Sequence, residues 1–130
     1  MTVFVTKRPV PDGKGWLPDL TPAQDYGPLE FIFEGHEKVF ALPQPALHKA
    51  RRVLLKKFKP EEDFLLHPNS TDQMVMVVCL AAIMDMRPEF IRVLYWDRTL
   101  QKDGSRDRRK GSYYPIKLEL RKPEAMRTGT

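Results

Sequence analysis

The feature that most constrains this chain is an unbroken apolar stretch in its second half. The eleven residues from Met74 to Met84 carry no polar side chain. This length is large for a strand and too small for a bilayer, which needs a helix of about 20 apolar residues. The Met, Ala and Leu content favours a helix. Because a helix that is apolar on every side must be covered on every side, we expect this chain or a neighbouring subunit to cover it.

The segments around this helix predict a small mixed sheet. Alternating apolar residues and turn residues indicate, in chain order, a β-hairpin at 29–42, an amphipathic helix at 46–58, and strands at 63–66, 90–96 and 113–120. The strand, helix and strand from Phe64 to Trp96 should form one parallel crossover. In the last strand we expect Ile116, Leu118 and Leu120 to point inward. The expected fold is α+β, in the order β-β-α-β-α-β-β, with the apolar helix buried.

Prolines set the beginning of the chain apart. Five of the twelve prolines lie in the first 28 residues, and proline disfavours helix at its own position and at the residue before it. We therefore expect an extended Pro-rich arm over residues 1–28, in which Thr2–Thr6 could add a short edge strand. Residues 29–121 then form a single α+β domain, and residues 122–130 form a flexible tail.

Composition excludes several classes of protein. The 130 residues carry a net charge of +5 and a single cysteine, which excludes an intramolecular disulfide and a multi-thiolate metal site. The sequence has no apolar run long enough for a bilayer and no charged-then-apolar signal segment. We expect a mildly basic, intracellular (cytoplasmic) protein that does not bind membranes.

The strongest functional pattern is a set of cations in two segments. They lie on one face of the helix at 46–58 and in a polar loop predicted at 99–112, which aromatic residues flank. Phosphates require positive charge and bases stack on aromatic rings, so this combination is typical of nucleic-acid binding. The alternative is that the charges only keep the protein soluble. The candidate residues are Lys49, Arg52, Lys56, Arg98, Lys102, Arg106, Arg108, Arg109 and Lys110, with Trp96 and Tyr114 to stack bases.

The turn from His67 to Asp72 is a second candidate site, for a nucleotide or another small ligand. It joins a strand to the apolar helix, and such turns lie where α/β folds bind ligands. The same turn also fits an ordinary helix start, with Ser70 as N-cap and Gln73 at the third helical position. The candidate residues are His67, Asn69, Ser70 and Thr71.

The sequence contains no motif that indicates catalysis. The three histidines fall in separate predicted elements, and no HExxH, GxSxG, P-loop or paired-cysteine pattern occurs. Cys79 lies within the apolar helix, so we expect a buried, inert thiol. We predict a non-enzymatic protein with no cofactor and no bound metal.

The Pro-rich arm carries possible anchors for a protein partner. Aromatic and aliphatic side chains dominate interface energies, and the arm contains Trp16, Leu17, Leu20 and Tyr26. These anchors pack either on this chain's own domain or on a partner. Exchange with a second subunit would also cover the apolar helix, so a homo-oligomer is among the expected assemblies.

Three functional hypotheses follow. The first is a basic protein that binds DNA, RNA or another polyanion through the cationic helix and the arginine-rich loop, which should then lie on the same side of the domain. The second is an interaction or inhibitor-type protein that acts through its arm or its sheet. The third is ligand binding at residues 67–72.

Overall fold

The computed structural model describes residues 1–11, 15, 17–68, 73–100 and 106–120, with the backbone alone for 97–100 and 106–112. The described residues form one five-stranded sheet in the order β2-β1-β3-β4-β5. The strands are β1 (Val3–Lys7), β2 (Leu29–Phe33), β3 (Phe64–Leu66), β4 (Phe90–Leu100) and β5 (Arg106–Glu119). Strand β1 pairs parallel with β2 and β3, β3 pairs parallel with β4, and β4 pairs antiparallel with β5.

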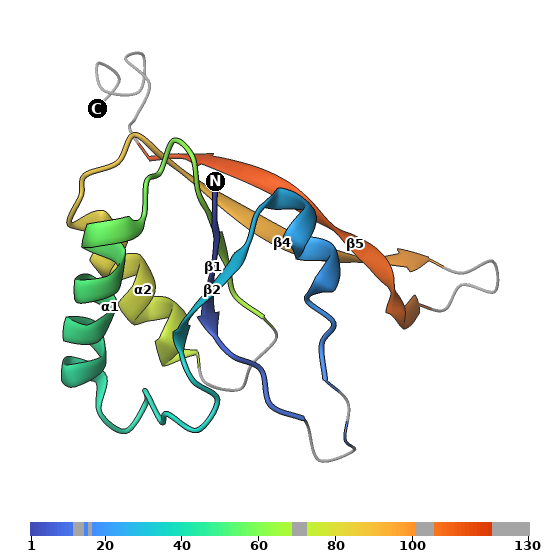
Figure 1. Ribbon diagram of the computed structural model, residues 1–130, viewed down its shortest axis with the longest axis horizontal. Helices are drawn as coiled ribbons and strands as arrows, with labels where there is room; N and C mark the ends of the chain where they lie inside the picture. The colour runs from blue at the N-terminus through green and yellow to red at the C-terminus, as the bar shows by residue number, and fades with distance from the viewer. Residues whose placement is uncertain (12–14, 16, 69–72, 101–105, 121–130) are drawn as a thin grey trace, which may run out of the picture.

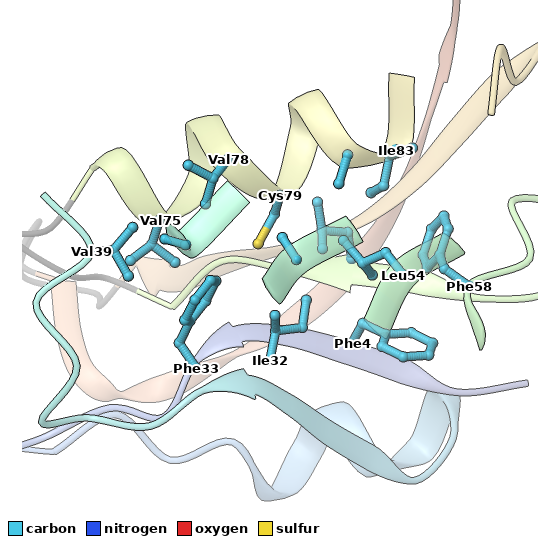
Figure 2. Close-up of a cluster of buried hydrophobic side chains, with 14 of the residues drawn as sticks. Phe4, Ile32, Phe33, Val39, Leu54, Phe58, Val75, Val78, Cys79 and Ile83 are labelled. Atoms are coloured by element: carbon cyan, nitrogen blue, oxygen red, sulfur yellow. The ribbon is translucent and has the colours of Figure 1, made fainter. Parts of the chain in front are cut away.

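Two helices lie on one side of this sheet and a short 3-10 helix lies on the other. Helices α1 (Pro43–Lys57) and α2 (Met74–Met84) pack in one core cluster with Phe4 of β1. The 3-10 helix η1 (Thr21–Tyr26) packs in a second cluster with Val3 and Val5. Successive strand residues point to opposite faces, so β1 contributes to both cores. Figure 2 shows Phe4 and Ile32 pointing from the strands into the core beneath α2.

The expected fold class is confirmed. The described chain forms a small α+β fold with a mixed sheet, the elements follow the order β-β-α-β-α-β-β, and β3, α2 and β4 form the parallel crossover. Helix α2 has the bounds that its apolar run predicts. Helix α1 begins at Pro43, three residues earlier than expected, because proline is tolerated in the first turn, where N–H groups have no intrahelical partner.

The predicted hairpin at 29–42 is wrong. Strand β2 ends at Phe33, residues 34–42 form turns and irregular backbone, and Val39 is buried without belonging to a strand. Strand β2 pairs instead with β1, which lies inside the sheet rather than at its edge. The residues Val3–Thr6 are all buried, as expected for a strand covered on both faces. Residues 1–28 are therefore not an arm throughout, because they supply a central strand and η1.

The predicted polar loop at 99–112 is also wrong, because most of it is strand. Strand β4 continues to Leu100 and β5 begins at Arg106. The pairing of β3 with β4 reaches Leu94, and beyond it β4 pairs with β5 in a two-stranded ribbon. A ribbon outside the core needs no apolar alternation, so its sequence resembles a loop. The tail at 122–130 lies outside the described residues.

Candidate interaction surface

The largest exposed apolar side chains of the sheet gather on one face of β4 and β5. Directly opposite residues of two strands share a face, and β5 is paired so that Tyr114 faces Tyr95 and Leu118 faces Ile91. Ile91 is buried in the core under the helices, so this face is the helix side of the sheet. We call the exposed part of it the open face, which consists of Tyr95, Tyr114, Ile116, Leu118 and Leu120, each 38–57% exposed.

The expectation that Ile116, Leu118 and Leu120 point inward is therefore wrong. They lie on the same face as buried residues of β4, but β5 packs on β4 and η1 rather than under a helix. Alternation along a strand shows that its two faces differ. Which face is covered depends on the position of the helices.

Around Tyr113, the opposite face of the same two strands is closed by η1. Tyr113 is 6% exposed, and its ring packs against Trp96 at an interplanar angle of 60°, with the centroids 4.8 Å apart. Tyr26 of η1 donates a hydrogen bond from its hydroxyl to the backbone oxygen of Tyr113 at 2.9 Å. Burial, with a smaller effect of the Asp19 carboxylate, raises the pKa of Tyr113 to about 12. We call this the covered face.

The outer edge of β5 presents the backbone groups of its odd-numbered residues. The N–H of Leu120 donates to the backbone oxygen of Glu89 on the β4 side, at 2.9 Å. Hydrogen-bonding directions alternate along an antiparallel strand, so Lys117 and Glu119 direct their N–H and C=O groups away from β4. The Tyr113 oxygen points the same way and accepts the Tyr26 hydroxyl. Pro115 has no N–H to offer.

Two opposite charges mark this edge on the covered side. The ammonium of Lys117 lies 3.3 Å from the Glu119 carboxylate, and both side chains are more than half exposed. The same ammonium lies 4.3 Å from the centre of the Phe90 ring. A short strand edge that carries charges and a proline is a known means of limiting unspecific strand pairing.

The cationic helix is partly neutralised by acidic residues from elsewhere in the fold. The ammonium of Lys49 lies 2.9 Å from both carboxylate oxygens of Glu37. Burial by itself would raise the pKa of Glu37, but hydrogen bonds from Lys49 and from the Glu34 N–H outweigh it and hold this pKa below its usual value. Two further cations of α1 are also paired, Arg51 with Asp85 at 2.7 Å and Lys57 with Glu30 at 2.6 Å. Of the candidate residues on this helix, Arg52 and Lys56 are exposed.

The arginine-bearing strand ends lie far from this helix. Figure 1 shows α1 at one end of the long axis and the outer ends of β4 and β5 at the other. The prediction that the two cationic segments share one side of the domain is therefore wrong. The strands carry Arg98, Arg106, Arg108, Arg109 and Lys110, whereas Lys102 lies outside the described residues. Trp96 is half-buried against Tyr113, and Tyr114 is exposed on the open face.

Comparison with known proteins assigns the chain to a family. Residues 1–120 match the family described as Phage Pam3 gp32-like protein. The chain belongs to this family. No curated protein and no solved structure matches it.

The structure describes only part of the predicted ligand turn. Asn69, Ser70 and Thr71 lie outside the described residues, and Gln73 is the N-cap of α2 rather than its third residue. A hydrogen bond of 2.8 Å joins the Nδ1 of His67 to the Thr6 hydroxyl. Within the described ranges, no three His, Cys, Asp or Glu side chains are grouped as metal ligands. Helices of the described chain are all too short or too polar to cross a membrane.

Two anchors of the arm, Leu20 and Tyr26, pack on this chain itself. Leu20 is buried, and the ring of Tyr26 meets Phe64 edge-on with the centroids 5.4 Å apart. Leu17 is exposed, and Trp16 lies outside the described residues. Cys79 is fully buried as expected, and burial raises the pKa of its thiol to about 12.

A shallow hollow of about 300 Å³ lies where α1 begins, beside the Lys49–Glu37 pair. Its apolar lining includes Phe33, Val39 and Leu42, and Arg52 lies on it as well. Neither this hollow nor the open face was predicted from the sequence. The sequence did carry a signal that β5 is an edge strand, because a proline and a Lys-x-Glu pair in one strand are typical of a sheet edge.

Proposed function

We propose that this chain is a protein-binding component of its phage-protein family, and that it binds its partner on the open face of β4 and β5. The observation that carries the proposal is the row of five large apolar side chains that this chain leaves exposed. Contiguous exposed apolar surface of this kind typically marks a protein interaction site. Tyrosine is moreover enriched among residues that dominate binding energies, and two of the five are tyrosines.

The backbone of the same region supports this proposal. A protein that adds a strand to β5 can accept and donate hydrogen bonds at Lys117 and Glu119, while its side chains pack on Ile116 and Leu118. Strand addition of this type combines main-chain affinity with side-chain specificity. It corresponds to the second hypothesis of the sequence analysis, in which the sheet is the binding element.

Site-specific photo-crosslinking tests the proposed function. A photoreactive residue replaces Leu118 in one protein and Leu55, which is exposed on α1, in the control. Each is expressed together with the proteins encoded beside it. We expect a defined protein adduct, identified by mass spectrometry, at position 118 and not at position 55. Equal adducts at both positions, or none at 118, would overturn the proposal.

Nucleic-acid binding remains a second candidate function, now centred on the β4–β5 ribbon rather than on α1. Five cations of the candidate set lie on its two paired strands, with Asp97 and Asp107 as the acids there. A two-stranded ribbon fits the major groove of DNA. If the ribbon binds phosphates, the Arg108→Ala/Arg109→Ala protein should lose about 1.4–1.8 units of log–log salt slope, and Arg52→Ala/Lys56→Ala should not change it. Absence of binding at low salt by the unmodified protein excludes this function.

A further inference from the structure

We propose that the partner of the open face is a second copy of this chain, joined edge to edge with β5 antiparallel to β5 and Leu118 opposite Leu118. This inference rests on the proposed function, because it uses the same strand. The joint is two-fold symmetric, so each copy presents the same surface to the other. The two five-stranded sheets then become continuous.

The backbone limits where such a joint can form. Pro115 cannot donate a hydrogen bond, and η1 covers the edge at Tyr113 through the Tyr26 hydroxyl. Among the β5 residues whose side chains the structure describes, 113–119, the edge left for a partner strand is therefore the end around Leu118. Figure 1 shows this end of β5 well away from η1. A symmetric joint centred on Leu118 places Lys117 opposite Glu119 of the second copy and lets their backbone groups bond in both directions.

Charge selects this register over its neighbours. With Leu118 at the centre, each Lys117 faces a Glu119, which gives two opposite-charge pairs. A joint centred on Lys117 places two lysines together and sets Pro115 opposite Glu119. A joint centred on Glu119 places two carboxylates together. In a sheet, like charges that face each other are destabilising and unlike charges are stabilising. The register centred on Leu118 is therefore favoured over those centred on Lys117 and on Glu119.

The apolar side chains agree with the same register. Even-numbered residues of β5 lie on the open face, and in this joint Leu118 contacts its own copy while Ile116 lies opposite Leu120. The two open faces thereby form one apolar strip shared by both copies. A register that pairs odd-numbered with even-numbered residues is excluded. It would place backbone groups that point towards the partner opposite groups that point away from it.

Cysteine cross-linking tests the register directly. Leu118 is expected in a non-hydrogen-bonded pair with a Cα separation of about 4.5 Å, which is within the range for a disulfide. In a Cys79→Ala background, Leu118→Cys should form a covalent dimer rapidly under mild oxidation. Ile116→Cys alone should not, because its copy lies four residues away along the strand. A mixture of Ile116→Cys and Leu120→Cys proteins should cross-link to each other. Equal cross-linking at 116 and 118 would overturn the register.

Charge reversal provides the second test, by sedimentation velocity over a range of concentrations. Lys117→Glu and Glu119→Lys should each shift the protein towards monomer, and the double exchange should restore the dimer.

A protein that is monomeric at every concentration overturns the inference. If that monomer still gives a defined protein adduct from position 118, the proposed function stands with another partner. If it gives no adduct, both fail. The side chains substituted between positions 116 and 120 are exposed. Thermal unfolding unchanged from that of the parent protein, with or without Cys79→Ala, confirms that each variant folds.

Discussion

Tyr113 and Tyr114 are neighbours in the chain and lie in different environments. Tyr113 is 6% exposed beneath η1, whereas Tyr114 is 50% exposed on the opposite face of the same strand. At this point along the two strands, one face is thus packed by their own chain and the other is not. The comparison separates two roles of apolar residues. On the covered face they stabilise the fold, and on the open face they are available to another molecule.

The largest expected effect comes from truncating the two tyrosines in turn. Tyr113→Ala should lower the free energy of unfolding by about 3–5 kcal/mol, because it removes a buried aromatic ring and leaves a cavity. Tyr114→Ala should change it by less than about 0.5 kcal/mol. Urea unfolding of the dilute proteins measures both. Similar losses for the two variants would show that the open face is also part of the core.

Helix α2 offers the same contrast in smaller measure. Cys79 is fully buried, whereas Val77 on the outer side of the helix is 55% exposed. Cys79→Ser should cost about 1–3 kcal/mol, because it buries a hydroxyl among apolar side chains. Val77→Ser should cost clearly less in the same urea titration. The native Cys79 thiol should resist alkylation at neutral pH, and rapid labelling of the folded protein would contradict its burial.

The hydrogen bond that joins η1 to β5 should have a moderate effect. Tyr26→Phe removes the donor to the Tyr113 oxygen and should lower the free energy of unfolding by about 0.5–1.5 kcal/mol. Tyr95→Phe, a matched change on the open face, should have almost no effect. If the two changes had equal effects in thermal unfolding, η1 would not be what closes the covered face.

The smallest effect concerns Glu37, which neutralises Lys49. The pKa of Glu37 is lower in the folded protein than its ordinary value. The ion pair therefore stabilises the fold at pH values above that ordinary pKa. The stabilisation is lost as the pH falls through the folded pKa. Glu37→Gln should therefore cost about 0.2–1 kcal/mol at neutral pH and nothing in strong acid. Glu61→Gln, at an exposed carboxylate, is the control. A loss that persists unchanged in strong acid would rule out the ion pair as its cause.

The sequence predicts those elements whose local pattern decides their structure. The apolar run sets the bounds of α2, and the alternation in Leu29–Phe33 predicts a strand. Neither pattern shows which strand or helix an element packs against. For this reason the assignment of β2 to a hairpin was wrong, and β1 was expected at an edge of the sheet. The ion pair of Lys49 with Glu37 and the exposure of Leu118 depend in the same way on where the chain places distant segments.

The candidate surface was harder to predict for a related physical reason. Ile116, Leu118 and Leu120 have the alternation of a half-buried strand, and that alternation is the same whether a helix or another protein covers them. The arginine-rich strands lack alternation because they extend beyond the core. A sequence therefore carries the periodicity of a face more clearly than the identity of what covers it.

The central position of β1 has a consequence for synthesis. Strand β1 pairs with β3, whose residues lie 61 positions later, and the Thr2 N–H donates to Asp63 across the same separation. Contacts between such distant residues slow folding, because a long loop must close before they form. During translation, Val3–Val5 can pair with β2 early, but their other edge has no partner until Phe64–Leu66 have emerged. Ribosome-stalled chains ending before residue 64 should bind a chaperone through this segment.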